Sequence, residues 1–228
     1  LTLPFAAAFC IALLVFTVPA QSQVYVGGEL TADETFAPGN NPYIVTQDLI
    51  VLKNVTLTLL PGVEMQFEAG TSLVVNGTLI AKGTNGQKIK FLPKNPGIVP
   101  GLWNGLVFNN TKTLMGADSA YLSGSVLSEA IISNASYSVT LDFSTALLIE
   151  NTRISRCSFG VYLKASGYNT IRNCEFSGCD FGIFMASGYL NPSNNIYRNS
   201  ISGSADVGIF INSNFTQPNQ NHISGNLI

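Results

Sequence analysis

The chain has 228 residues and a formal net charge of −2, with 11% charged and 46% hydrophobic residues. This content is ample for one elongated hydrophobic core. It provides no basic footprint for nucleic acid, so we expect no nucleic-acid partner.

An apolar run opens the chain at residues 4–18 and ends near Ala20 and Ser22, either of which suits a cleavage site for a secretory signal. The run is too short to span a bilayer. We therefore expect a helical signal segment over residues 1–22, with an uncleaved anchor as the alternative. Because no Met and no basic region precede the run, we expect this end of the chain to be incomplete.

Residues 23–42 are predicted to lead into the fold or to cap it. From residue 43 to residue 108, short segments alternate between apolar and polar side chains, most clearly at 55–59, 63–67 and 73–75. Turn dipeptides such as Pro61-Gly62 and Asn76-Gly77 separate these segments. The pattern predicts one short strand after another. Residues 109–150 are less regular, with a loop expected at 109–117 and strands at 126–133 and 139–143.

Three segments, at residues 59–67, 73–84 and 100–108, closely resemble secreted right-handed parallel β-helix repeat proteins. Residues 27–36 and 42–48 are similar to the first β-helix of animal bark beetle-type adhesion ectodomains, and the same phrases occur in microbial β-helix proteins. The first resemblance implies a right-handed parallel β-helix. The second implies a large cell-surface protein of epithelial junctions, attached to the membrane through a C-terminal segment that this sequence lacks.

The end of the chain repeats itself. Residues 151–163 and 173–185 carry the same pattern 22 residues apart, a third copy begins at Asn199, and a fourth begins at Asn226. Periods of this size with strand-like alternation indicate stacked coils. The sequence therefore predicts an all-β fold, a parallel β-helix (solenoid) over residues 43–228. Since the last repeat stops without a cap, we expect it to be truncated at its C-terminus.

Parallel pairing should align equivalent residues of successive coils in columns about 4.8 Å apart. The expected core columns are Ile154–Phe176–Ile201, Val161–Ile183–Ile209 and Leu163–Met185–Ile211. One corner should carry an amide ladder of Asn151, Asn173, Asn199 and Asn226. A second corner should need the positive φ of Gly160, Gly182 and Gly208. Arg153 and Glu175 should form an ion pair between coils.

Cys157 and Cys179 fall in one column, at a separation that a disulfide can bridge, and a buried ladder of unpaired cysteines is the alternative. Cys174 is then either paired with a cysteine outside this sequence or a buried thiol. Five glycosylation sequons indicate an extracellular glycoprotein if the source is eukaryotic. They are Asn54, Asn76, Asn109, Asn134 and Asn214; Asn109 and Asn214 look best placed, whereas Asn76 is alternatively a turn residue.

Cleavage of polysaccharides would need a recognisable set of residues. Inverting glycoside hydrolysis uses two carboxylates about 6.5–9.5 Å apart, and uronate lyases need clustered acids and a base. The chain has 13 Asp and Glu and one histidine, without a paired-aspartate or histidine motif of this kind. We therefore assign no catalytic residue, no metal site and no cofactor, and we lean against an enzyme.

Three weak binding candidates remain. Asp180 and Asp206 form one expected column and Arg172 and Arg198 another, with a solvated corner as the alternative for both. Trp103 could stack on a sugar, and packing in the core is its alternative role. His222 aligns with Asn195 and Thr170, which suggests a turn residue.

The leading hypothesis is a non-enzymatic β-helix, secreted or on the extracellular face of the plasma membrane, that binds carbohydrate or extracellular protein in cell adhesion. The rival is a polysaccharide lyase, epimerase or hydrolase whose catalytic coils lie outside this sequence. The fold alone cannot separate them.

Overall fold

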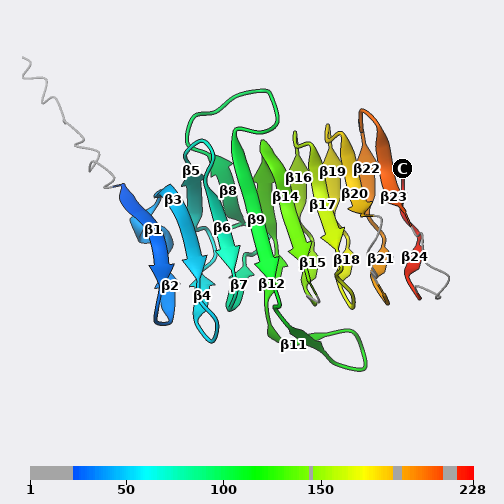
Figure 1. Cartoon of the computed structure of the whole chain (residues 1–228), viewed down its shortest axis with the longest axis horizontal. Helices are drawn as coiled ribbons and strands as arrows, with labels where there is room; N and C mark the ends of the chain where they lie inside the picture. The colour runs from blue at the N-terminus through cyan, green and yellow to red at the C-terminus, as the bar shows by residue number, and fades with distance from the viewer. Residues whose placement is uncertain (1–22, 144–145, 187–191, 213–219) are drawn as a thin grey trace, which may run out of the picture.

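The computed structural model describes residues 23–143, 146–186, 192–212 and 220–228. Within these ranges the chain winds through eight coils that stack along one axis, from β1 in blue to β24 in red (Figure 1). The structure is an all-β parallel solenoid, as predicted. The signal segment expected over residues 1–22 lies outside the described residues. No helix in the described ranges is long and apolar enough to cross a membrane.

Each coil contributes strands to three parallel sheets. The long strands β1 (Val24–Leu30) and β3 (Tyr43–Val51) run through the first and second sheets and join them. The first sheet continues with β5 (Glu64–Phe67), β8 (Ile89–Pro93), β13 (Ala130–Ser133), β16 (Arg153–Ser155), β19 (Glu175–Ser177) and β22 (Ser200–Ser202). The second continues with β6 (Ser72–Val75), β9 (Trp103–Asn109), β14 (Ala135–Asp142), β17 (Phe159–Lys164), β20 (Phe181–Met185) and β23 (Val207–Ile211).

The third sheet holds one short strand from every coil. Its order is β2 (Glu34–Phe36), β4 (Thr56–Leu59), β7 (Thr78–Lys82), β12 (Val126–Ser128), β15 (Leu148–Glu150), β18 (Thr170–Arg172), β21 (Asn195–Tyr197) and β24 (His222–Ser224). Residues 23–42 already supply β1, β2 and a single 3-10 turn at Pro38–Asn40, so they form the first coil.

One apolar core runs through the coils from Phe36 to Ile201. The strand register confirms the three columns: Ile154 pairs with Phe176 and then Ile201, and the columns that begin at Val161 and Leu163 hold as expected. In the last coil the core position is not reached by Ile211, which is 44% exposed. Period-two alternation explains this core, because every second residue of a strand points inward. The ion pair between Arg153 and Glu175 is also confirmed, at 2.9 Å, with both side chains about half exposed at 57% and 49%.

The predicted glycine corner is wrong. Gly160, Gly182 and Gly208 lie inside β17, β20 and β23, and none has a positive φ. They are small for a different reason, since a Cβ at Gly160 would collide with the carbonyl oxygen of Gly182 and the ring of Phe176. One column of positive φ values lies instead at the corner between the first and second sheets, at Asn134 (60°), Arg156 (52°), Gly178 (61°) and Gly203 (61°).

The predicted asparagine ladder splits into two neighbouring columns. Asn151 and Asn173 occupy a corner position with φ values of 49° and 52°, but the next coil places Arg198 there, at φ 56°. Asn199 lies one residue further along and stacks on Cys174, because β19 and β22 pair with an offset of 25 residues rather than 26. The second column is therefore Thr152, Cys174, Asn199 and Asn226.

This second column satisfies buried backbone groups between coils. The side chain of Asn199 accepts a hydrogen bond from the Cys174 amide and donates to the Ile171 carbonyl, both at 3.0 Å. Asn226 donates to the Ile196 carbonyl in the same way. A further ladder went unnoticed in the sequence: Asn169, Asn194 and Asn221 directly precede β18, β21 and β24, and the amides of Asn169 and Asn194 each donate to the next asparagine's side-chain oxygen. The sequence signal for this ladder was an asparagine directly before each of three equivalent strands.

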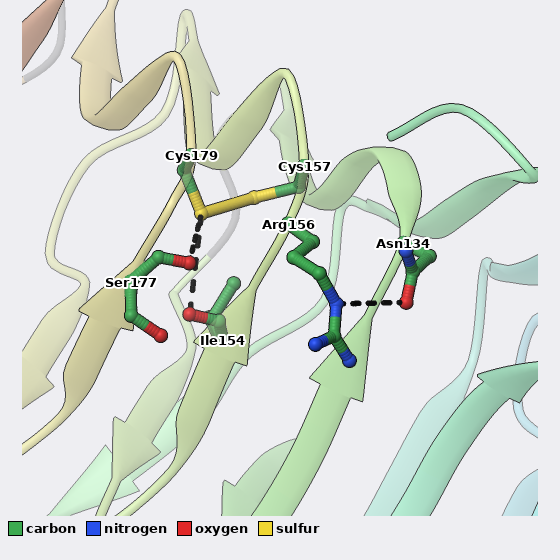
Figure 2. The surroundings of a disulfide bond; sticks show 6 residues. All are labelled: Asn134, Ile154, Arg156, Cys157, Ser177 and Cys179. Carbon is green, nitrogen blue, oxygen red and sulfur yellow. Dashed lines mark hydrogen bonds between the residues drawn. A yellow bond between two sulfur atoms is a disulfide. The ribbon is translucent and has the colours of Figure 1, made fainter. Parts of the chain in front are cut away.

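Cys157 and Cys179 face each other from adjacent coils, with Cα atoms 4.6 Å apart, and their sulfur atoms are joined in a disulfide (Figure 2). Cys174 is a free, buried thiol. Burial raises its pKa from the ordinary 9.0 to about 12. A thiol held protonated in this way is a poor nucleophile.

Candidate binding groove

The outer face of the third sheet carries two columns of polar side chains near its C-terminal end. The central residues of β18 and β21, Ile171 and Ile196, point into the core. Their neighbours therefore point outward. The register gives one column of Thr170, Asn195 and His222 and a second of Arg172, Tyr197 and Ser224. The alignment of His222 with Asn195 and Thr170 is confirmed, but the predicted turn is wrong, because His222 begins β24.

A hairpin lies against this face. The sequence suggested a loop at 109–117, but the structure has β10 (Thr113–Met115) and β11 (Tyr121–Gly124) paired antiparallel, leaving the coil between β9 and β12 (Figure 1). Arg172 holds the hairpin: its guanidinium donates to the Ser119 carbonyl at 3.0 Å. Lys82 also lies over the ring of Tyr121, 5.0 Å from its centroid.

Arg172 is itself fixed by its neighbours on the sheet. It donates to the Glu150 carboxylate at 2.7 Å and to the Tyr197 hydroxyl at 3.1 Å. Burial alone would lower the pKa of Arg172, but the hydrogen bonds to Tyr197 and Glu150 raise it above its ordinary value. The charge of Arg172 is thus neutralised by Glu150, and the side chain serves to position the hairpin.

The hairpin and the sheet together border a groove of about 590 Å³. Its lining includes Ser119, Asn195, Tyr197, Arg198, His222 and Ser224. Within the described part of the chain, the side-chain amide of Asn195 makes no hydrogen bond. His222 is partly occupied, because its Nε2 lies 2.9 Å from the Ser224 hydroxyl. The groove therefore offers an amide, a phenol, an imidazole, a guanidinium and hydroxyls to a guest. Sequence reasoning had singled out only Arg172 and Arg198 among these groups as binding candidates.

The Arg172/Arg198 column predicted from the sequence is wrong. Arg172 pairs with Tyr197, and Arg198 follows at the corner position, by the same one-residue register difference that splits the asparagine ladder. Asp180 and Asp206 do lie on adjacent coils, with the Asp206 amide donating to the Asp180 carbonyl at 3.0 Å. They stand beside the second sheet, at the start of β20 and β23, whereas Arg172 belongs to the third.

Trp103 is not a sugar platform. Its side chain is 0% exposed, stacks on Phe67 with ring centroids 4.0 Å apart, and donates its indole N–H to the Ser133 carbonyl. A buried indole needs such an acceptor. The single tryptophan is therefore a core residue, which was the alternative role.

The sequons differ in accessibility. Asn54 is exposed in a turn, at φ 66°. Asn76 and Asn109 are half-buried and share an amide hydrogen bond of 3.0 Å, so Asn109 ends a strand and is not in an open loop. Asn134 is only 2% exposed and donates to the Gly97 and Val99 carbonyls, which makes it a structural turn residue unsuited to a glycan in the folded chain. Asn214 lies outside the described residues.

A second surface feature was missed from the sequence. Six aromatic rings stand on the outer face of the second sheet in two columns, Tyr137–Phe159–Phe181 and Tyr162–Phe184–Phe210. Phe159 and Phe181 stack with centroids 5.0 Å apart and planes within 6°. Because the rings cover each other's faces, the stripe contributes to packing between coils and leaves little ring face for a sugar. The sequence signal for this stripe was the phenylalanine that precedes both Gly160 and Gly182.

No group of three or more His, Cys, Asp or Glu residues that could hold a metal occurs among the described residues. What the fold and the groove define is a class of protein: a parallel β-helix with a polar groove on its outer wall. The family model described as right handed beta helix region matches residues 103–228, more than half of the chain, and the chain belongs to this family.

One curated relative is similar over a short stretch. A segment of 63 residues is 36% identical to Protein bark beetle of Drosophila melanogaster, covering 28% of this chain and 2% of that protein. The chain thus corresponds to a very small part of that relative's length. No solved structure matches the chain.

Proposed function

We propose that this β-helix is a non-enzymatic, secreted or cell-surface domain that binds carbohydrate in the groove beside β18, β21 and β24, with cell adhesion as its setting. The observation that carries the proposal is the lining of the groove. Amide, phenol and hydroxyl groups of Asn195, Tyr197 and Ser224 project from the rigid third sheet at the spacing of its strands.

The size and chemistry of the groove support a glycan guest. A volume of about 590 Å³ lies within the roughly 300–1,000 Å³ of ordinary ligand sites. Sugar hydroxyls both donate and accept hydrogen bonds, as do amides and hydroxyls. Because the donors project from strands and not from a free loop, little ordering is needed when a ligand binds.

Titration calorimetry with a panel of oligosaccharides tests the proposal. Asn195→Ala should weaken binding about five- to thirtyfold, through loss of one or two hydrogen bonds worth about 1 kcal/mol each. Thr58→Ala on β4, at the far end of the same sheet, is the control and should leave the affinity unchanged. Absence of binding across the panel, or equal losses in both variants, would contradict the proposal.

The rival function is a polysaccharide lyase, epimerase or hydrolase. It is addressed by incubating the chain with polygalacturonate and alginate and measuring new reducing ends, unsaturated products and inverted uronate residues. The binding proposal expects none of these products. Turnover that survives purification to homogeneity would replace it with the enzymatic function.

A further inference from the structure

We infer that the groove selects glycans that carry an anionic group, a carboxylate or a sulfate, and that Arg198 binds this group. The inference rests on the proposed carbohydrate function and narrows its ligand class. It is carried by the charge of the groove and by the position of Arg198 within it.

Arg198 differs from the other arginines in its partners. Arg153 and Arg172 form ion pairs with glutamates, at 2.9 and 2.7 Å, and Arg156 lies 3.4 Å from the side-chain oxygen of Asn134. For Arg198, no side-chain hydrogen bond or ion pair occurs with any residue that the structure describes. Its guanidinium is exposed on the rim of the groove and has its full donor capacity available.

Arg198 occupies a corner with a positive φ, where asparagine would be less strained than arginine. Asn151 and Asn173 hold the equivalent corner in the two preceding coils, and asparagine tolerates a positive φ better than arginine. At Arg198, φ is 56° and the amide donates to the Ser224 carbonyl at 3.2 Å, so the corner is closed by the backbone. The side chain itself is not needed for this turn. In the next coil Gly225 leaves the space beside the Arg198 Cγ open.

The groove has no carboxylate in its lining. Beside the groove, Glu150 is paired with Arg172, which neutralises its charge. Asp118 precedes the lining residue Ser119 and accepts the Ala120 amide of its own turn at 3.0 Å, and it does not itself line the groove. Arg198 therefore places a positive charge in the lining, and no carboxylate among the described residues forms an ion pair with it. A guanidinium binds a planar carboxylate or a sulfate through two parallel hydrogen bonds, which are stronger than those between neutral groups.

The test compares three oligosaccharides of equal length by calorimetry: a neutral glucan, an oligogalacturonate and a heparin-derived sulfated chain. We expect the anionic chains to bind about fivefold more tightly than the neutral one, the value of an exposed ion pair of about 1 kcal/mol. Arg198→Gln should remove that difference and leave neutral binding intact. Arg153→Gln, which removes an exposed arginine from the first sheet, is the matched control. The affinities of the oligogalacturonate and the sulfated chain, compared with each other, show whether the site prefers a carboxylate or a sulfate.

Each other result overturns the inference. Equal binding of neutral and anionic chains that Arg198→Gln does not alter would leave carbohydrate binding in place and remove the anion site. An anionic preference reduced equally by both variants would indicate general electrostatic attraction instead of a site at Arg198. No binding of any of the three chains would overturn both the inference and the proposed function.

Discussion

At the corners of the coils, some backbone amides and carbonyls point away from the sheets, and side chains of the same or the adjacent coil satisfy them. Thr152 and Cys174 each donate to a carbonyl two residues back in their own turn. Asn199 and Asn194 accept backbone amides from the adjacent coil. These side chains are buried. A buried polar group without a partner costs about 1–3 kcal/mol. The identity of each corner residue therefore depends on which backbone groups its neighbours leave unpaired.

Replacing Asn199 with alanine should lower the free energy of unfolding by about 3 kcal/mol, because the Cys174 amide and the Ile171 carbonyl would both lose their partner. Asn173→Gly is the control. That corner is exposed and has a positive φ, so the change should stay within about 0.5 kcal/mol. Urea denaturation measures both. Equal losses would mean that Asn199 fixes only the backbone conformation.

Cys174 gives the stability a pH dependence at alkaline pH. Its pKa is about 12 in the folded chain against an ordinary 9.0. Below pH 9 the thiol is protonated in both states, and above it only the unfolded chain ionises, so stability falls as pH rises toward 12, by up to about 4 kcal/mol. Cys174→Thr, which copies Thr152, should lack this loss. Parallel declines of the two proteins with pH would contradict the assignment.

The repeats show what the sequence could and could not predict at this scale. Residues that stack in the core were placed correctly, because Val161, Ile183 and Ile209 share both the alternation and the spacing. The asparagines were misplaced, since two adjacent corner positions both accept asparagine and only the strand register separates them. For Trp103 the sequence left two roles open, with packing the more common, because an aromatic residue at the start of a strand suits both the core and the surface.

Among the elements, the hairpin of β10 and β11 is the one that no repeat predicts. Its strands are short and have no counterpart in another coil, so neither periodicity nor alignment reveals them. The hairpin is attached to the third sheet through Arg172 and the contact between Lys82 and Tyr121, and at its base Thr113 donates to the Ala146 carbonyl at 2.9 Å. An isolated two-stranded hairpin is marginal in water. Its position over the groove thus depends on these attachments.

Arg172→Met should release the hairpin without unwinding the coil. It removes an ion pair whose partners are only 17% and 19% exposed, together with the bond to Ser119. Amide hydrogen exchange across residues 113–124 should accelerate about tenfold or more, the equivalent of about 1.4 kcal/mol. Arg153→Met is the matched control, because that pair is exposed and worth less than about 1 kcal/mol. Unchanged exchange in Arg172→Met would show that the hairpin is held by other contacts.

Across the whole molecule, a single core passes through successive coils without a polar break from Phe36 to Ile201. Repeat proteins couple mainly through neighbouring units. With such a continuous interface, we expect the described coils to unfold together. Trp103, the single tryptophan, reports on the middle of this core because it is fully buried on β9.

Ile183→Ala tests this coupling. It truncates a fully buried side chain on β20, three strands along the second sheet from β9, and should cost about 3 kcal/mol. The fluorescence transition of Trp103 in urea should move by as much as the circular dichroism transition. A tryptophan transition that stays in place while dichroism shows two steps would mean that the coils unfold in separate groups.

The register of the third sheet also separates positions that tolerate little change from positions that tolerate more. Ile171, Ile196 and Ile223 repeat along one line of the sheet, whereas the residues on either side of them change from coil to coil. The inner line must fit the core, whereas an outer position is tied to the next coil only where its side chain pairs across, as Arg172 does with Tyr197. The outer wall can thus be altered one coil at a time wherever no such pair is present, without a redesign of the scaffold beneath it.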